Sequence, residues 1–557
     1  MKFEDILQQI GGYGKFQKKL TFLFVIPIYI IIPWFWLSRI LSLSVPEHWC
    51  HVPELKFSNL STEEKRKLIS PSDDASCSFY NVNYTDMLVK GILKVTNDSE
   101  AVPCLNGWEH DTKYYESTAA TKFEMYCHYD YLPSLLLTIY IVGQTIGAPL
   151  NGYLSDKFGR KHVFFFVTTT TLIIEIAAPL VNHLSIFTFI MLLRGITAPS
   201  MFCLPYVLVS EVTPPEMRVN MNGIMNTSWT TGLTILPLIA YLSRDWTVLC
   251  YINAGSALFV LAYTWYIPES PCWLLSRGRV DESLKIMMRI AKENGKEQNE
   301  TELLLHLQKI KVKAEKEKEE ENSSKNVMLR YPRLRKHFLI LAFCWTSFNV
   351  GYNGVTFNTV NLNGNEFVNY FLLGLVEFPS NVLFWYVMGK FGRRWSATAG
   401  YFFSGVACLL PVIGFEYSGI ISTLIGKFLV GGVIMITDQQ AMELIPTVCR
   451  SFGMGAGKTV SYIAGLTTPF IAYLSIYGEA IPFVIISATC FIASVLTSFL
   501  PETANTYLPQ TILEAEEFGR DQKYRSWIRQ TTATKTEQVI VSTIEDVKKE
   551  IHEGSTR

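Results

Sequence analysis

Long apolar runs separated by short polar stretches recur along the whole chain. Twelve of these runs are about 20 residues long, the length that an α-helix needs to cross the hydrocarbon core of a bilayer. The pattern predicts an all-α membrane protein with twelve transmembrane helices. The predicted spans are residues 21–41, 132–153, 162–181, 187–209, 222–242, 247–267, 337–357, 367–388, 397–415, 419–443, 452–476 and 480–500.

Polar residues of the first half recur at matching places in the second half. Pro268-Glu269-Ser270 returns as Pro501-Glu502-Thr503, 233 residues later. Two related halves predict two pseudo-symmetric six-helix bundles, an arrangement that usually places a substrate path between them. Further matched positions are Arg194 and Lys427, Glu211 and Glu443, Arg218 and Arg450, and the segments 152–161 and 389–394.

Composition and charge agree with a membrane protein. The chain has 557 residues, of which 49% are hydrophobic and 18% are charged, whereas soluble domains carry about 25% charged residues. The formal net charge is zero, so there is no electrostatic support for a nucleic-acid partner. The expected partners are the lipid bilayer and a small-molecule substrate.

Lysine and arginine gather at alternate ends of the predicted spans, which predicts that both termini and the central loop are cytoplasmic. Residues 1–20 are too polar for a signal peptide. The expected division is a cytoplasmic N-terminus (1–20), a first span (21–41), an external loop (42–130), the rest of the N-terminal bundle (132–267), a cytoplasmic helical linker (268–336), a C-terminal bundle (337–500) and a cytoplasmic tail (501–557).

The external loop contains four of the eleven cysteines and three glycosylation sequons. An even number of cysteines outside the cell predicts two disulfides, with three pairings open; the alternative is that some thiols stay free. No cysteine has the spacing of a metal site, and no cofactor is expected. The cysteines are Cys50, Cys77, Cys104 and Cys127, and the acceptors are Asn59, Asn83 and Asn97.

The segment from Gly152 to Lys161 resembles the signature of the major facilitator superfamily. From about residue 10 to 505 the chain also resembles the organic cation, carnitine and organic anion transporter family (solute carrier family 22). The resemblance implies transport by alternating access and residence in the plasma membrane, although a vesicle membrane gives the same topology. The other matching segments are 14–17, 106–108, 268–275, 376–379, 443–450 and 501–503.

The resemblance implies a conformational role for a set of residues at the predicted cytoplasmic ends. The chain departs from the family at three places: Cys272 replaces an arginine, Gly389 replaces the acid of the second signature, and Tyr462 occupies the position of the usual charge-selecting Asp or Arg. The expected gating residues are Gly152, Asp156, Arg160, Lys161, Arg194, Glu211, Arg218, Arg393, Glu443 and Arg450.

Ionisable residues within spans are costly, so each is a functional hypothesis. Lys458 and Tyr462 share one helix face, and Lys458 is expected to bind a substrate carboxylate while Glu377, or else Asp438, binds an ammonium group. The alternative is that Lys458 pairs with Asp438 or Glu377 and only locks two helices together. Glu175 is expected to pair with a basic group or a hydroxyl in its own bundle.

Aromatic residues offer further contacts to a cation, worth about 0.5–2 kcal/mol each. Trp34 and Trp36 are predicted to lie at the membrane interface. Positions that match the family's cavity complete the predicted binding set, which is Glu377, Asp438, Lys458, Tyr462, Trp345, Tyr352, Asn353, Phe202 and Asn226.

These features predict a transporter of small organic cations or zwitterions, such as carnitine-like compounds, amines or small amino acids. The alternatives are an organic anion transporter that uses Lys458, and a receptor or scaffold that has lost transport. No nucleophile–base arrangement is present, and the glycines before Lys458 lack phosphate-loop spacing, so no enzyme is expected. The sequence leaves open whether Na⁺ or H⁺ is coupled to transport.

Overall fold

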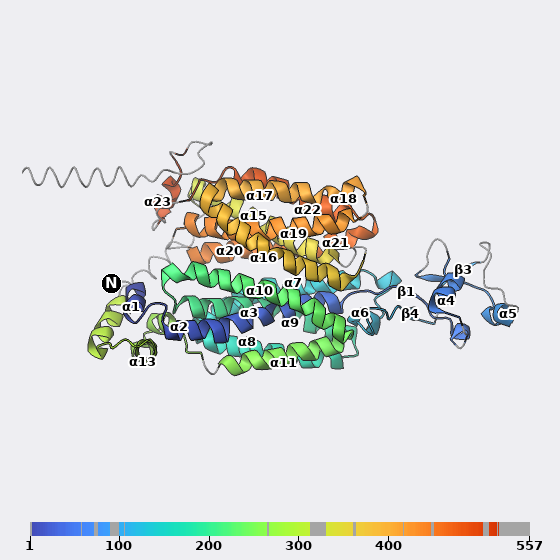
Figure 1. The fold of residues 1–557 in the computed structure, drawn as a ribbon, viewed down its shortest axis with the longest axis horizontal. Helices are drawn as coiled ribbons and strands as arrows, with labels where there is room; N and C mark the ends of the chain where they lie inside the picture. Colours follow the sequence, from blue (N-terminus) through green and yellow to red (C-terminus); the bar gives the residue numbers. More distant parts are fainter. Residues whose placement is uncertain are drawn as a thin grey trace, which may run out of the picture.

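Two helix bundles lie side by side, one from each half of the chain (Figure 1). The computed structural model describes residues 3–56, 58, 60–71, 76–89, 100–104, 106–264, 267–311, 330–359, 364–415, 417–446, 450–504, 509, 512–520 and 522. The described residues between positions 43 and 131 lie mostly beyond one end of the bundles, called here the loop end. The helices α2 (Lys15–Leu20), α13 (Val280–Glu293) and α23 (Ile512–Glu517) lie at the other, called the linker end.

Each bundle contains six long helical segments. Ten helices among the described residues are long and apolar enough to cross a membrane; α22 is shorter, and α10 is richer in Asn and Thr. The first bundle consists of α3 (Ile26–Ser42), α7 (Leu132–Phe158), α8 (Arg160–Ala177), α9 (Leu184–Ser210), α10 (Pro215–Ser243) and α11 (Trp246–Thr264). The second consists of α15 (Pro332–Asn358), α16 (Glu366–Phe391), α17 (Arg393–Cys408), α19 (Ser418–Leu444), α20 (Arg450–Gly465) with α21 (Thr468–Tyr473), and α22 (Ile481–Thr497).

Two predicted spans differ from the observed helices. The first begins earlier, because α2, the π-helical turn Thr21–Val25 and α3 run on without a break. The eleventh, predicted as 452–476, is divided into α20 and α21, and Pro469 lies in the first turn of α21. Proline is well accommodated there because the amide groups of a first helical turn have no partner within the helix.

The segment between α3 and α7 is a small disulfide-linked unit. The strands β1 (His48–Cys50) and β4 (Trp108–His110) pair antiparallel, as do β2 (Ser78–Tyr80) and β3 (Ala101–Pro103). Disulfides join Cys50 to Cys104 and Cys77 to Cys127. The unit also contains α4 (Thr62–Ile69), α5 (Tyr84–Val89) and α6 (Ala119–Lys122). Asn83 is exposed before α5, whereas Asn59 and Asn97 lie outside the described residues.

Glu269 explains the first copy of the repeated Pro-Glu motif. Its carboxylate accepts hydrogen bonds from the backbone amides of Arg160 at 3.0 Å and Lys161 at 3.2 Å, at the N-terminus of α8. An anion is favourable there because these amides lack helical partners and carry the positive end of the helix dipole. Gly159 has a φ of +103°, and a Cβ atom at this position would lie 2.3 Å from the carboxylate.

Glu502 occupies the matching place in the second bundle. It accepts from the amides of Arg393 at 2.8 Å and Arg394 at 3.1 Å, at the N-terminus of α17. Gly392 precedes them with a φ of +84°, and a Cβ atom there would lie 2.5 Å from the Glu502 carboxylate. The repeated Gly-Arg and Pro-Glu motifs are therefore two parts of one helix-capping contact, present once in each bundle.

Each bundle also carries its own helix at the linker end. Lys19 forms a 2.6 Å ion pair with Glu293 at the end of α13, and the amide of Phe16 donates to Asn294 at 2.9 Å. On the second bundle, Glu516 of α23 accepts from the backbone amide of Leu334 at 2.9 Å, at the start of α15. Both helices are thus attached to one bundle each.

The hydrophobic core changes along the long axis of the molecule. At the loop end, one buried cluster contains residues of both bundles, among them Leu37 and Leu136 from the first and Phe367 and Ile486 from the second. Towards the linker end the two bundles have separate clusters. The bundles are therefore packed together most extensively at the loop end.

Candidate functional site

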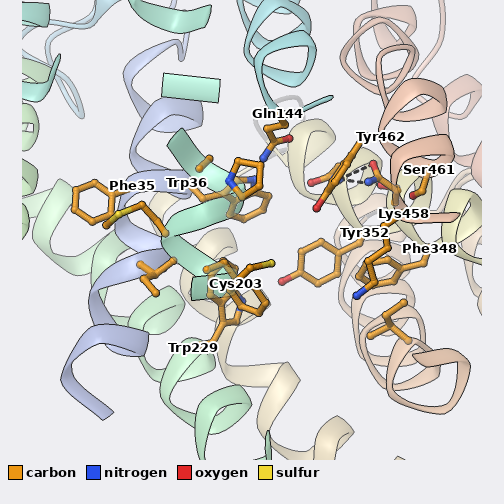
Figure 2. A pocket seen from close by; sticks show the side chains of 18 of the residues that line it. Phe35, Trp36, Gln144, Cys203, Trp229, Phe348, Tyr352, Lys458, Ser461 and Tyr462 are labelled. Atoms are coloured by element: carbon orange, nitrogen blue, oxygen red, sulfur yellow. Dashed lines mark hydrogen bonds between the residues drawn. The ribbon is translucent and has the colours of Figure 1, made fainter. Parts of the chain in front are cut away.

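A cavity of about 340 Å³ lies between the two bundles and is lined by both. Figure 2 shows Phe35, Trp36 and Cys203 on one side of it and Tyr352, Lys458 and Tyr462 on the other. All nine residues of the predicted binding set line this cavity: Glu377, Asp438, Lys458, Tyr462, Trp345, Tyr352, Asn353, Phe202 and Asn226.

Aromatic rings from both bundles meet in the middle of the cavity wall. The ring centre of Trp36 on α3 lies 6.4 Å from Trp229 on α10 and 6.0 Å from Tyr352 on α15. Phe202 lies edge-on to Trp229 at 5.5 Å. Their arrangement gives the cavity several ring faces that could contact a cation.

The prediction that Trp36 lies at the membrane interface was wrong. Ile32, Trp36 and Arg39 share one face of α3, because residues three and four apart are neighbours on a helix, and all three line the cavity. Trp34 points elsewhere and donates its indole N–H to the carbonyl of Gly232 on α10 at 3.1 Å. The three-residue spacing between Trp36 and Arg39 could have identified Trp36 as a cavity residue once Arg39 was recognised as a charge within the span.

Glu377 on α16 is held by two partners of its own bundle. Its Oε1 lies 3.3 Å from Nζ of Lys427 on α19 and accepts a 2.8 Å hydrogen bond from the Tyr352 hydroxyl. Lys427 Nζ also lies 2.9 Å from the centre of the Tyr352 ring and donates to Thr356 at 3.0 Å. The repeat matches Lys427 with Arg194, but the pairing of Lys427 with Glu377 was not predicted from the sequence.

Lys458 and Asp438 face each other across the cavity wall of the second bundle. Lys458 Nζ lies 3.5 Å from Asp438 Oδ2, and the Trp345 indole donates to Asp438 Oδ1 at 2.7 Å. The two charged side chains are 47% and 36% exposed, so both remain accessible from the cavity. The alternative interpretation of Lys458 expected this ion pair with Asp438 and gave it only the role of locking two helices together. The pair nevertheless lies in a position that a ligand can reach.

The first bundle contains a buried polar cluster where α3, α7, α8 and α9 meet. Arg194 Nη2 forms a 2.7 Å ion pair with Glu175, which gives Glu175 the basic partner expected of it. The guanidinium of Arg39 lies 3.9 Å from the centre of the Tyr140 ring. Sequence reasoning missed Arg39, although it lies within the predicted span 21–41.

The predicted gating residues fall into two separate groups, one per bundle. Arg160 lies 3.1 Å from Asp156 and 3.7 Å from Glu211 in the first bundle. Arg393 lies 3.3 Å from Glu443 in the second bundle, where Gly389 supplies no acid. Gly152 is exposed on α7, the amide of Lys161 is held by Glu269, and Arg194 belongs to the buried cluster above. The side chains of Arg218 and Arg450 lie outside the described part of the chain.

Burial and ionic contacts act in opposite directions on Glu211, which follows the last turn of α9. Burial raises its pKa above the ordinary value for a glutamic acid, and the nearby Arg160 partly offsets the shift. Burial therefore disfavours the charged form of the Glu211 carboxyl group, and the Arg160 guanidinium favours that form.

Hydrogen bonds and ring contacts join the bundles at the loop end. Glu366 Oε2, in the first turn of α16, accepts from Ser44 Oγ at 2.7 Å and from the Tyr115 hydroxyl at 2.8 Å. The Phe367 ring lies 5.0 Å from that of Tyr115. We call Ser44, Tyr115, Glu366 and Phe367 the loop-end latch. It was not predicted, because Glu366 directly precedes the predicted span 367–388.

Two six-helix bundles, with a cavity between them that aromatic and charged side chains line, define a membrane transporter of the major facilitator fold. The structure is similar to the inward open conformation of the xylose transporter XylE from E. coli, with a TM-score of 0.58 and 14% sequence identity over 90% of this chain and 99% of that chain. At this identity the likeness concerns the fold alone.

Sequence comparison gives the family. A model of the sugar (and other) transporter family matches residues 105–511. The chain is 30% identical to a carcinine transporter of Drosophila melanogaster, over 94% of this chain and 81% of that protein. It is 28% identical to a β-alanine transporter of the same species, over 88% and 85%, and 29% identical to the human organic cation/carnitine transporter 2, over 87% and 89%. The chain belongs to the sugar (and other) transporter family of the major facilitator superfamily and, within it, to the organic cation, carnitine and organic anion transporter family (solute carrier family 22). It is therefore a transporter and not an enzyme.

Proposed function

We propose that this transporter carries small organic cations or zwitterions, and that it does so by alternating access. The observation that carries this proposal is that the two acids of the second bundle that line the cavity each lie beside an aromatic donor. Tyr352 donates to Glu377 at 2.8 Å, and Trp345 donates to Asp438 at 2.7 Å. A carboxylate beside ring faces suits an ammonium group, which gains from both.

The relatives support the same class of substrate. They are named for carcinine, β-alanine and carnitine, and we extend only the general class of small amine-bearing compounds to this chain. The nine cavity residues of the predicted set are proposed to contact the substrate. Glu377 and Asp438 attract its cationic end, and the rings of Trp345, Tyr352, Phe202 and Tyr462 enclose it.

An organic anion is the second proposed class of substrate. It is favoured by the half-exposed ammonium group of Lys458, which faces the cavity. Under this second proposal the anion displaces Asp438 from Lys458. Under the first proposal, the cationic end of the substrate displaces Lys458 from Asp438.

The shared core at the loop end supports a state closed on that side and accessible from the linker end. We propose that the loop end is extracellular and that both termini and the linker are cytoplasmic, in the plasma membrane. Disulfides at the loop end and the lysines and arginines at the linker end agree with this orientation. Transport then requires the latch to open and the gating residues of the two bundles to approach one another.

The test is uptake into cells that express the protein, with a labelled panel of a quaternary ammonium cation, carnitine, a small amino-acid zwitterion and an aryl carboxylate. Lys458→Gln and Asp438→Asn are measured beside the wild type. The cation or zwitterion proposal predicts that the wild type takes up amine-bearing compounds and that this uptake falls in Asp438→Asn. Simple cation uptake should survive in Lys458→Gln.

Other results would point elsewhere. Uptake of only the aryl carboxylate, lost in Lys458→Gln, would replace the first proposal by the anion transporter. Absence of flux for every compound, with the protein shown to be at the cell surface, would favour a receptor or scaffold.

A further inference from the structure

Most of the described charged side chains in and beside the cavity form ion pairs, but one arginine does not. Three ion pairs account for most of them: Arg194 with Glu175, Lys427 with Glu377, and Lys458 with Asp438, at 2.7, 3.3 and 3.5 Å. Arg39 also lines the cavity, and no ion pair is recorded for it in the described part of the chain. The charged side chains that line the cavity are three cations and three acids, but Glu377 is paired with Lys427, which does not itself line the cavity. Arg39 is therefore the lining cation without an ion pair of its own in the described part of the chain.

Arg39 is held in position but incompletely satisfied. Its side chain is only 4% exposed. Its Nε donates to the carbonyl of Phe35 one turn earlier, and its guanidinium lies 3.9 Å from the centre of the Tyr140 ring. Its Nη1 is buried without a hydrogen-bond partner among the described residues, as is Nε of the nearby Arg194.

A purely structural role explains this geometry poorly. A buried guanidinium with no ion pair of its own and with Nη1 unused is costly, because it has lost water and gained few partners. The nearby Glu175 attracts it, but that carboxylate already pairs with Arg194. The face of Tyr140 offsets only part of that cost. An arginine presents a planar fork of donors that matches a carboxylate, and such charge-assisted pairs are the stronger hydrogen bonds in proteins.

We infer that Arg39 forms a carboxylate-binding subsite at one end of the cavity, with Arg194 beside it. The inference rests on the proposed function and narrows it: the substrate carries a carboxylate in addition to its cationic end. Lys458 is a weaker carboxylate partner, because Asp438 already neutralises it.

The position of Trp36 indicates how far apart the two ends of the substrate lie. Trp36 and Arg39 are three residues apart on one face of α3, a rise of about 4.5 Å along the helix. A cationic group on the rings of Trp36 and Trp229 can then place a carboxylate at Arg39 if only a short spacer joins the two. The preferred class is therefore a short zwitterion such as an ω-amino acid.

Matched pairs of ligands test this inference on purified, full-length protein. Each pair contains a carboxylate and its neutral amide, with either a primary amine or a trimethylammonium group at the other end; β-alanine and β-alaninamide form the simplest pair. Binding is measured as the increase in melting temperature with ligand concentration. It is measured independently as protection of Cys203, an exposed free thiol in the cavity wall, against a thiol reagent.

The variants are Arg39→Gln and Arg39→Lys, with Arg279→Gln as a control at an exposed arginine outside the cavity. We expect wild-type protein to bind at least one carboxylate about tenfold or more tightly than its amide. Arg39→Gln should remove this preference while leaving amide binding unchanged, and Arg39→Lys should keep part of it. The control should behave as wild type.

Three outcomes would overturn the inference: no carboxylate preference in the wild type across the panel, a preference that survives in Arg39→Gln, or an equal loss of amide and carboxylate binding in both Arg39 variants. The measurements with the amide ligands distinguish failure of the Arg39 subsite from failure of the proposed cation or zwitterion transport. Amide binding without a carboxylate preference would reject the subsite and retain a cation transporter. Binding of the carboxylates with no binding of any amide would retain the subsite and leave the cationic end without support.

Discussion

The Tyr115 hydroxyl donates a 2.8 Å hydrogen bond to Glu366, and this bond connects the segment after α3 to the first turn of α16 in the other bundle. Ser44 donates to the same carboxylate oxygen at 2.7 Å. The second oxygen of Glu366 is buried without a recorded partner. The Glu366 carboxyl group depends strongly on its two donors, because it has left water and none of the described residues places a cation beside it.

Removing one donor should therefore favour opening of the loop end. A hydrogen bond to a buried carboxyl group contributes about 1–3 kcal/mol, so Tyr115→Phe should raise the population open at that end about fivefold or more. Cys203 provides the measurement. A membrane-impermeant thiol reagent added to intact cells should label Cys203 faster in Tyr115→Phe than in wild type.

Two controls accompany this experiment. Cys203→Ser in both backgrounds reports labelling at other thiols, and Tyr114→Phe changes a neighbouring tyrosine of the same loop that donates no recorded bond to Glu366. Equal labelling rates in Tyr115→Phe and wild type would show that the bond does not govern opening.

The buried pair of Lys427 and Glu377 should show strong coupling. Lys427→Met leaves a buried carboxylate, and Glu377→Gln leaves a buried ammonium group, so each single change should cost about 3–5 kcal/mol. The double variant removes both charges and should cost clearly less than the sum of the two. Thermal unfolding in detergent gives the values for this double-mutant cycle.

The exposed pair of Arg279 and Glu282, 2.6 Å apart, is the matched control. Its coupling should stay within about 1 kcal/mol, because water screens exposed ion pairs. Additive losses at Lys427 and Glu377 would mean that the two side chains act independently.

The carboxylates of Glu269 and Glu502 should contribute similarly to stability. Each accepts two backbone amides at a helix N-terminus, so replacement by Ala should cost about 1–2 kcal/mol in either bundle. Replacement by Gln should cost less, since an amide oxygen still accepts. Melting temperatures of the four variants give the comparison, and Glu282→Ala serves as the exposed control. A loss confined to one bundle would contradict the equivalence of the two sites.

Trp36 should contribute to cation binding and Trp34 should not. Trp36→Ala should weaken inhibition by a quaternary ammonium compound about 2- to 30-fold, the range expected for losing one cation–π contact. Trp34→Phe removes an indole hydrogen bond to Gly232 on α10, and neither residue lines the cavity, so it should leave the inhibition constant near the wild-type value. Similar effects at both positions would indicate general damage to α3.

Hydropathy located the long helical segments of both bundles, because most apolar runs have the length of a membrane helix. It missed the earlier start of the first segment and the division of the eleventh into α20 and α21. It could not predict which face of a span meets the cavity, since lipid and protein core both select apolar side chains. The side of α3 that faces the cavity, with Trp36 and Arg39, was therefore not predicted. The repeat identified Lys427, but its acid partner Glu377 comes from a helix without an equivalent role in the first bundle, where Glu175 of α8 pairs with Arg194.

The disulfides and the helix caps could also be predicted only in part from the sequence. The even number of cysteines gave the number of disulfides but not their pairing, because four cysteines allow three connectivities. The Pro-Glu motifs were recognised as a repeat. Their function was hidden, because Glu269 caps a helix more than 100 residues earlier in the chain, a contact that sequence spacing does not reveal.

The attachment of α13 and α23 to different bundles has a practical consequence. Lys19 and Glu293 hold one helix to the first bundle, and Glu516 holds the other to the second. Spectroscopic labels placed on the exposed faces of these two helices would move with their own bundles. Their separation would then follow the transport cycle in real time, without any label inside the cavity to disturb the ligand.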